Sequence, residues 1–307
     1  MSVREVIFLG TSSQVPTRTR NHNAIFLRWD DLGILFDPGE GTQRQMAHAG
    51  IAAHQITHIA ITHFHGDHCL GLAALVQRIS LDRVPHPIEV IFPASGQVYY
   101  DRLRNASIFH DQSKIVPRPF PNASSAVVAK FAQGELLAYP LDHRVDCYGY
   151  RLQERDGRRM LPEKLEAFGL QGSDIGQLVR RGVFEKEGRT HTLEEMSTFR
   201  KGQSFALVMD TRPCKGATEL AKGADLLVCE STYLSSEHKE AHDHYHMTAA
   251  QAATLAKEGG VRRLALTHFS QRYPSTEPFL QEARTQFKEV FVAHDLTRVL
   301  VPPREEK

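Results

Sequence analysis

Three imidazoles and one carboxylate occupy six consecutive positions of this 307-residue chain, from His63 to His68. The stretch reads Thr-His-Phe-His-Gly-Asp-His from Thr62 onward. Burying so many titratable groups is costly unless something binds them. Imidazole and carboxylate together are the ligands that zinc and similar divalent ions prefer. The stretch therefore predicts a metal site, in particular one for two ions, with hydrolysis by metal-activated water as its chemistry.

The residues around this stretch predict where it lies in the fold. Ile56–Thr62 is apolar and strand-like, and Cys69–Ser80 has apolar residues at helical spacing. His63 and His65 are two positions apart, so they face the same side of an extended chain. Gly66 permits a tight turn after them. We therefore expect these ligands on a loop between a strand and a helix, where a scaffold can aim them.

Two ions need more ligands than one local cluster supplies, so others must come from distant positions. His143, Asp210 and His268 each follow a predicted strand, which suggests that these strand ends converge on one edge of the sheets. Each residue alone has an ordinary alternative, because a histidine after a strand is more often a surface or internally bonded residue. Asp210 could simply form a turn and cap a helix. Asp67 is the natural group to orient or deprotonate water, and a histidine suits the leaving alkoxide.

Hydrophobic patterning predicts an α/β protein in which two sheets pack together with helices outside. The other predicted strands are Val3–Leu9, Ala24–Trp29, Leu32–Asp37, Ile88–Phe92, Ala126–Phe131, Leu136–Pro140, Tyr148–Leu152, Phe205–Asp210, Leu226–Glu230, Arg263–Thr267 and Val290–Ala293. The other predicted helices are Ala94–Asn105, Glu163–Phe168, Cys214–Lys222, Thr248–Glu258 and Glu277–Lys288, with Thr248 and Thr276 as N-caps.

Charge and cysteine content limit the possible partners. The formal net charge is +1, whereas a protein that binds polyanions over its whole surface is usually more basic. Any nucleic-acid contact must then come from local patches. The chain has no basic, apolar leader in its first twenty residues and no apolar run of about 20 residues, so we expect neither a signal peptide nor a spanning helix. Four cysteines without a Cys-x-x-Cys pair predict reduced thiols in a cytosolic protein. They are Cys69, Cys147, Cys214 and Cys229.

The composition changes between Arg151 and Gly202. This segment holds eleven Lys/Arg and nine Asp/Glu, few aromatic residues and no long apolar period. We interpret it as an insertion that projects from the core. Composition alone leaves two readings equally open, a functional element and a solvated excursion with no function.

Several motifs carry a resemblance to a known family. His-x-His-x-Asp-His, followed by a distant His, Asp and His, resembles the metallo-β-lactamase superfamily. Five further runs narrow this to the ribonuclease Z family of tRNA 3′-processing endonucleases, and the likeness extends from about Val3 to Ala293. These runs are Phe36–Gln43, Gly10-Thr11 with Arg20-Asn21, Asp210–Cys214, Ala221–Leu227 and Leu266–Tyr273.

The resemblance implies a single metallo-β-lactamase-type domain over residues 1–307, an αβ/βα four-layer sandwich of two mixed β-sheets with helices outside. It also implies an inserted tRNA-binding arm at residues 151–202, and this favours the functional reading of that segment. Two Zn²⁺ per subunit, precursor tRNA as the substrate, a homodimer and a cytoplasmic location are further implications, with no DNA or membrane partner. The family's arm carries a Gly-Pro pair, and Ser173 stands here where proline is expected. The geometry of the arm or its affinity for substrate could differ for that reason.

The resemblance assigns roles residue by residue. One ion would be held by His63, His65 and His143, the other by Asp67, His68 and His268, with Asp210 bridging. Asp67 would also accept the proton of water, and His246 would assist the leaving 3′ oxygen. Glu230 lies in a run like the family's and would orient His246, or it is simply a structural carboxylate. Arg180 and Arg181 are the candidate RNA contacts in the arm, and His242 and His244 are interpreted as loop histidines.

The predicted function is a zinc-dependent endoribonuclease that removes 3′ trailers from precursor tRNA. It would leave a 3′-hydroxyl on the tRNA and a 5′-phosphate on the trailer. An alternative is a small-molecule phosphodiesterase or (thio)esterase of the same superfamily, which would need no arm. A non-catalytic RNA-binding protein is the third reading. Loss of metal ligands would favour it, yet all seven candidates are present.

Overall fold

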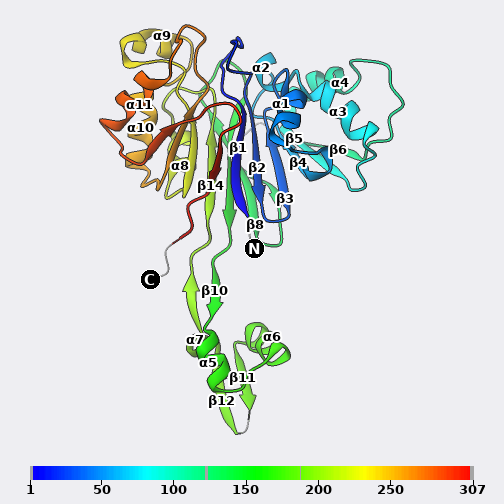
Figure 1. The fold of residues 1–307 in the computed structure, drawn as a ribbon, viewed down its shortest axis with the longest axis vertical. Coiled ribbons are helices and arrows are strands. Elements are labelled where there is room, and N and C mark those ends of the chain that lie inside the picture. The colour runs from blue at the N-terminus through cyan, green and yellow to red at the C-terminus, as the bar shows by residue number, and fades with distance from the viewer. Residues whose placement is uncertain (1–2, 122–123, 187, 305–307) are drawn as a thin grey trace.

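Two seven-stranded sheets pack face to face with helices on their outer sides, as predicted (Figure 1). The computed structural model describes residues 3–121, 124–186 and 188–304. The first sheet runs in the order β18 (Arg298–Leu300), β1 (Arg4–Gly10), β2 (Ala24–Trp29), β3 (Leu32–Phe36), β4 (His58–Ala60), β5 (Ile88–Pro93) and β6 (Ile115–Phe120). The second runs β17 (Val290–Val292), β16 (Leu264–Thr267), β15 (Leu226–Glu230), β14 (Ser204–Val208), β9 (Cys147–Glu154), β8 (Gly134–Leu141) and β7 (Ala126–Lys130).

Both sheets are mixed. Strands β3 to β6 pair in parallel in the first sheet, as β14 to β17 do in the second, and the remaining neighbours pair antiparallel. In β1, Val6 and Phe8 face the core between the sheets, while Ile7 and Leu9 face the helices. Because both faces of this strand are buried from Val6 to Leu9, its sequence is continuously apolar there rather than alternating.

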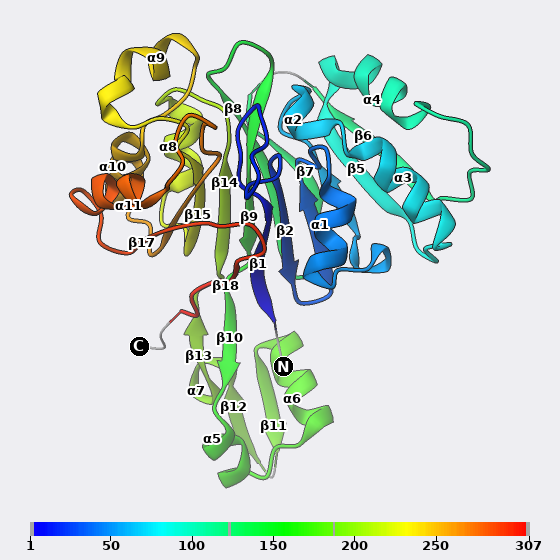
Figure 2. The same ribbon diagram turned by 45° about the horizontal axis from the view of Figure 1, so that its top comes forward.

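Helices on each outer face complete the four layers (Figures 1 and 2). Among the described residues, none of the helices has the length and apolar character needed to cross a bilayer. The first sheet carries α1 (Thr42–Ala49), α2 (Gly66–Cys69), α3 (Leu72–Leu81) and α4 (Gln97–Arg104). The second carries α8 (Lys215–Ala221), α10 (Ala249–Glu258) and α11 (Glu277–Arg284), and α9 (His238–Asp243) lies above them in Figure 1.

The single helix predicted over Cys69–Ser80 is wrong in one respect, since the chain forms two helices there. Asp67 and His68 lie inside α2, and α3 begins only at Leu72. The cause is Gly71, whose N–H donates to the Pro38 carbonyl at 2.9 Å. A Cβ at Gly71 would lie 2.1 Å from the Gly39 oxygen, so only glycine permits this contact.

Two predicted helix caps have different outcomes. Thr248 caps α10 as expected, because its hydroxyl accepts from the Gln251 N–H at 3.2 Å. Thr276 is the N-cap residue of α11 as expected, but its side chain forms no cap hydrogen bond. Outside the arm, α1, α9, β6 and β18 were also not predicted, and within the arm only the helix near Glu163–Phe168 was.

The predicted insertion projects from the end of the second sheet (Figures 1 and 2). Arg151–Glu154 still belongs to β9, so the arm begins after Glu154 rather than at Arg151. Residue 187 lies outside the described residues. The arm comprises β10 (Gly157–Met160), α5 (Pro162–Ala167), α6 (Gly172–Arg181), β11 (Val183–Lys186), β12 (Arg189–Thr192), α7 (Leu193–Met196) and β13 (Ser197–Arg200). It has a small core of its own: Leu165, Leu170, Leu178 and Met196.

Glu154 joins the root of the arm to the body. Its buried carboxylate accepts two hydrogen bonds from the Arg4 guanidinium, both at 2.8 Å, and two from Arg200, at 2.8 and 3.2 Å. The Gln203 N–H donates a fifth at 2.9 Å. Burial alone would raise the pKa of the Glu154 carboxyl, but the bonds from Arg4 and Arg200 outweigh it and lower that pKa to about 2.

This lowered pKa predicts how pH affects the stability of a Glu154→Gln variant. Since the folded-state pKa lies below the ordinary 4.5, the stabilisation is present above that value and is lost as pH falls toward about 2. We expect the variant to lose about 1–3 kcal/mol of unfolding free energy at pH 7. The difference from the parent protein should shrink as pH falls, measured by urea unfolding in the presence of a chelator. Glu219→Gln, at an exposed ion pair with Lys222, is the control. A difference that does not change with pH would contradict this account.

Candidate metal centre and catalytic site

All seven candidate ligands meet at one end of the two sheets. The arm leaves the opposite end (Figure 1). His63 and His65 follow β4, Asp67 and His68 belong to α2, His143 follows β8, Asp210 follows β14, and His268 follows β16. Arg180 and Arg181 are exposed at the end of α6 in the arm, apart from this group.

The ligand atoms form two groups that share Asp210. In the first, the nitrogens of His63, His65 and His143 and a carboxylate oxygen of Asp210 lie within 4.8 Å of one another. His65 Nδ1 is 3.0 Å from His63 Nε2 and 3.2 Å from His143 Nε2. Asp210 Oδ2 is 3.6 Å from His63 Nε2. This donor set suits a zinc-like divalent ion.

The second group contains Asp67, His68, His268 and the same Asp210, again within 4.8 Å. His68 Nε2 lies 3.2 Å from His268 Nε2 and 3.3 Å from Asp67 Oδ2. Asp210 Oδ2 is 3.4 Å from His68 Nε2. A single carboxylate is therefore shared by both groups.

The surroundings of Asp210 favour a bound cation. It is buried, and within the described residues its Oδ1 accepts no hydrogen bond, although His268 Nε2 is 3.2 Å away. Its backbone φ is 41° and that of His268 is 63°, which are left-handed values that residues other than glycine rarely adopt. Strain of this kind persists only where the surrounding structure enforces it, and it is common at functional sites.

The electrostatics of the groups also favour bound cations. Burial lowers the pKa of His63, His65 and His143, which leaves their imidazoles neutral with a lone pair available. Burial alone would lower the pKa of His68 as well, but the charges of Asp210, Asp67 and Asp37 raise it. Without a metal ion, the positive charge of protonated His68 balances these carboxylates. A bound metal ion would supply that positive charge instead.

Two buried carboxylates fix the imidazoles from behind. On the side of the first sheet, Asp37 accepts from His68 Nδ1 at 2.8 Å and from the Thr62 hydroxyl at 2.8 Å. His63 Nδ1 donates in turn to that hydroxyl at 3.0 Å. These bonds occupy Nδ1 of both rings and direct each Nε2 toward the ligand groups. The sequence indicated Asp37 only as part of a family-like run.

Glu230 does the same on the side of the second sheet. It is fully buried and accepts from His246 Nδ1 at 2.9 Å, the Thr232 hydroxyl at 2.7 Å and the Thr211 N–H at 2.8 Å. His268 Nδ1 donates to the same Thr232 hydroxyl at 3.0 Å. Burial alone would lower the pKa of His246, but the charge of Glu230, then that of Asp210, and the bond to Glu230 raise it to about 9.

A cleft of about 620 Å³ opens onto both groups. His65, Asp67, His143, Asp210 and His246 line it together with Tyr233, His244 and Arg272. The His244 ring is stacked near the Tyr233 ring, with 6.4 Å between centroids, and the Arg272 guanidinium lies 4.9 Å from the Tyr233 centroid. His244 was predicted to be a plain loop residue, yet it lines this cleft. Arg272 stands in a family-like run, which was its only signal in the sequence.

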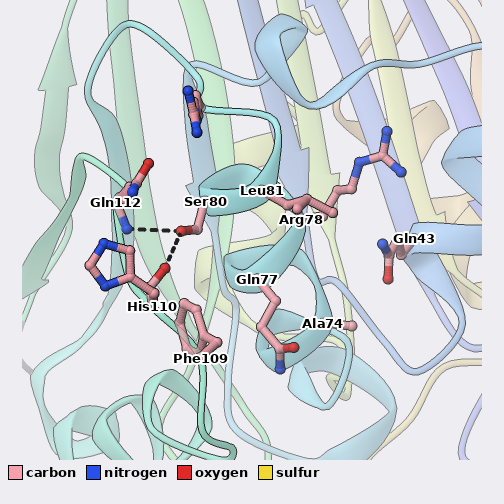
Figure 3. A pocket seen from close by; sticks show the side chains of 10 residues that line it. Gln43, Ala74, Gln77, Arg78, Ser80, Leu81, Phe109, His110 and Gln112 are labelled. Carbon is pink, nitrogen blue, oxygen red and sulfur yellow. Dashed lines mark hydrogen bonds between the residues drawn. The ribbon is translucent and has the colours of Figure 1, made fainter.

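A second hollow, of about 550 Å³, lies between α3 and residues 109–112 (Figure 3). The Ser80 hydroxyl accepts from the Gln112 N–H at 2.8 Å and donates to the His110 carbonyl at 3.2 Å. None of the candidate ligands lines this hollow. We therefore place the chemistry in the cleft over the two ligand groups.

Comparison with known proteins identifies the family. Ribonuclease Z of Streptomyces avermitilis is 54% identical over 306 residues, which are 99% of this chain and 100% of that protein. The chain belongs to the ribonuclease Z family. The crystal structure of the short form of human tRNase Z is similar, with a TM-score of 0.73, 27% identity, and coverage of 97% of this chain and 99% of that one.

Two weaker likenesses add the fold alone. YhfI of Bacillus subtilis, a metallo-β-lactamase fold protein, has a TM-score of 0.70 at 16% identity, with coverage of 97% of this chain and 99% of that one. A family model described as anti-Pycsar protein Apyc1 matches residues 4–111. The predicted superfamily fold is therefore confirmed, and the family assignment rests on the full-length relatives.

The bonds behind the imidazoles predict the effect of an Asp37→Asn variant. Loss of the carboxylate that orients His68 and Thr62 should weaken zinc affinity roughly 10–100-fold, as partners of metal-ligating histidines do elsewhere. Competition with a chromogenic chelator measures this affinity. Asp225→Asn is the matched control, because Asp225 is a buried carboxylate that bonds Ser204 and Arg262 away from the ligands. Equal affinity in the parent protein and the Asp37 variant would refute the role.

Proposed function

We propose that the protein is a metal-dependent endoribonuclease that removes 3′ trailers from precursor tRNA. The cut would leave a 3′-hydroxyl on the tRNA and a 5′-phosphate on the trailer. One observation carries the proposal: two ligand groups share Asp210 beside a carboxylate-bound His246, in a chain that belongs to the ribonuclease Z family.

The proposed cofactor is two Zn²⁺ per subunit. His63, His65 and His143 would hold one ion, and Asp67, His68 and His268 the other, with Asp210 shared. Such ions, when bound, lower the pKa of water to about 7 and stabilise charge on a phosphodiester. The neutral histidines, the unpartnered oxygen of Asp210 and the shared carboxylate support this assignment.

Asp67 and His246 are the proposed proton-transfer residues. His68 and His268 outweigh the effect of burial and hold the pKa of the Asp67 carboxyl below its usual range, so Asp67 is ionised and can orient the attacking water or accept its proton. His246, with its pKa near 9, is protonated at neutral pH and can donate to the leaving 3′ oxygen. The Glu230 carboxylate sets the direction of that imidazole, so its proposed role is positional.

The arm is the proposed contact for the body of the tRNA. Arg180 and Arg181 are exposed at its surface, where they can bind phosphates of a folded RNA. Ser173 is the second residue of α6. Proline is tolerated in this first turn because the backbone N–H groups there have no acceptor within the helix. The helix therefore forms with serine in the place of the family's proline, and the expected difference lies in contacts rather than in the backbone.

We also infer a homodimer in the cytoplasm. The arm ends just before Ser204, and the candidate ligand Asp210 follows the other end of β14. At strand spacing, the arm and this ligand are therefore roughly 20 Å apart. An RNA held by the arm of one copy could thus extend toward the site of a second.

All four cysteines are free thiols, which suits a reducing compartment. Light scattering should give twice the chain mass of 34.6 kDa, and cell fractionation tests the location.

Cleavage of an end-labelled precursor tRNA tests the proposed activity. We expect one cut after the discriminator base, abolished by a chelator and restored by Zn²⁺. Asp67→Ala should lower the rate roughly 10²–10⁴-fold, as loss of a general base does. Asp243→Ala, at an exposed carboxylate of α9, should cleave normally. Intact precursor with zinc-loaded protein would overturn the proposal, and normal cleavage by the Asp67 variant would overturn the role of that residue.

Replacing residues 157–200 by a short glycine linker separates the proposed activity from the small-molecule alternative. The Michaelis constant for precursor tRNA should rise roughly tenfold or more, because phosphate contacts dominate such binding. Hydrolysis of bis(p-nitrophenyl) phosphate should be unchanged. A double Arg180→Ala, Arg181→Ala variant should show part of the effect, and the exposed pair Arg284→Ala, Lys288→Ala on the body should show none. An unchanged Michaelis constant for precursor tRNA without the arm would contradict the proposed role of the arm.

A further inference from the structure

A third cavity, of about 650 Å³, adjoins the catalytic cleft. The two cavities share His65, His143 and Arg144 as lining residues. Two of these are candidate metal ligands, so the third cavity begins where the proposed chemistry occurs. It continues toward α4 and the turn between β8 and β9, and Phe64, Tyr99 and Val145 line it. The function proposed above does not use this cavity.

Two aromatic rings that line this cavity are stacked on each other. The Phe64 ring packs edge-on against Phe92, at 5.7 Å between centroids. It also lies so close to Gly96 that a Cβ there would be 2.0 Å from the ring. The Tyr99 ring stacks on Phe64, at 5.9 Å and 29°. Because Tyr99 is 48% exposed, part of this stack is accessible to solvent.

The charges around these rings suit one kind of ligand. The guanidinium of Arg102 lies 5.7 Å from the Tyr99 centroid, and Arg144 stands between the cavity and the cleft. Asp146 also lines the cavity, and its negative charge balances the positive charge of Arg144. Binding in the cavity must therefore depend chiefly on ring contacts. Exposed stacked aromatics with nearby arginines are the usual platform for single-stranded nucleic acid, and they accept any base.

The position of His246 decides which part of the substrate enters here. His246 lines the catalytic cleft but not the third cavity, and it is the proposed donor to the leaving 3′ oxygen. That oxygen belongs to the mature tRNA, so the tRNA end lies on the His246 side. The chain beyond the scissile phosphate must leave by another route, and the third cavity starts at His65 and His143.

We propose that Phe64 and Tyr99 form a stacking platform for the first nucleotides of the 3′ trailer. The inference rests on the proposed function and adds a binding site for the part of the substrate that is discarded. Recognition by ring stacking requires no particular trailer sequence. The platform would hold the trailer while the phosphate is at the ligand groups.

Kinetics with an abasic trailer test this platform. Tyr99→Ala should raise the Michaelis constant for a precursor with a six-nucleotide trailer about tenfold, in the range of one lost stacking contact. Tyr99→Phe should restore it. With abasic residues at the first three trailer positions, the parent protein should lose affinity by a similar factor, and Tyr99→Ala should lose little more. Val98→Ala, equally exposed on α4 but outside the cavity, is the control.

The other outcomes overturn the proposal in distinguishable ways. A Tyr99→Ala variant with an unchanged Michaelis constant removes the platform, and an equal loss on the abasic trailer assigns Tyr99 a structural role only. Weaker binding of mature tRNA by Tyr99→Ala would place the tRNA end, rather than the trailer, in the cavity. If the parent protein fails to cleave any precursor, the proposed function itself has failed, and that result is visible before any variant is compared.

Discussion

The hydrogen bonds from imidazole Nδ1 atoms to two buried carboxyl groups are the interaction on which the site depends. Asp37 holds His68 directly and His63 through Thr62, while Glu230 holds His246 directly and His268 through Thr232. Each carboxylate stands at the end of a central strand, β3 or β15, one in each sheet. The two halves of the molecule thus use the same device, and together they direct four rings toward one space.

This arrangement concentrates charge that the protein alone balances poorly. Asp67, Asp210, Asp37 and Glu230 are all buried at this end of the sheets. Desolvation of so many carboxylates is unfavourable unless cations pair with them. The backbone at Asp37, Asp210 and His268 also adopts left-handed values, each costing on the order of 1–3 kcal/mol. The apolar core between the sheets, in which Phe36 lies 5.6 Å from Phe205, offsets these costs and keeps both sheet ends in place.

The sequence predicted the parts of this structure that depend on local patterns. Strands β2 and β15 match their predicted ranges, because burial on both faces gives continuous apolar runs. The break between α2 and α3 was not predictable in this way, since it results from contact of Gly71 with Gly39, which is far away in the sequence. Helix α1 was missed because polar residues, Thr42 and Gln45, occupy half of its buried positions. The edge strand β18 was missed because two of its three residues are exposed.

The same distinction applies to the site. A dense motif such as His63 to His68 is visible in any sequence, and strand-end positions indicated His143, Asp210 and His268. The roles of Thr62, Thr232 and the Asp37 carboxylate become apparent only when the two sheets face each other, because each acts on a ligand without being one. Tyr99 has still less signal in the sequence, as one exposed aromatic on a surface helix. Its proposed role follows from its position, because its ring stacks on Phe64, the residue between His63 and His65. The chain therefore couples metal ligation to the third cavity within a single tripeptide, and a change at Phe64 would disturb both.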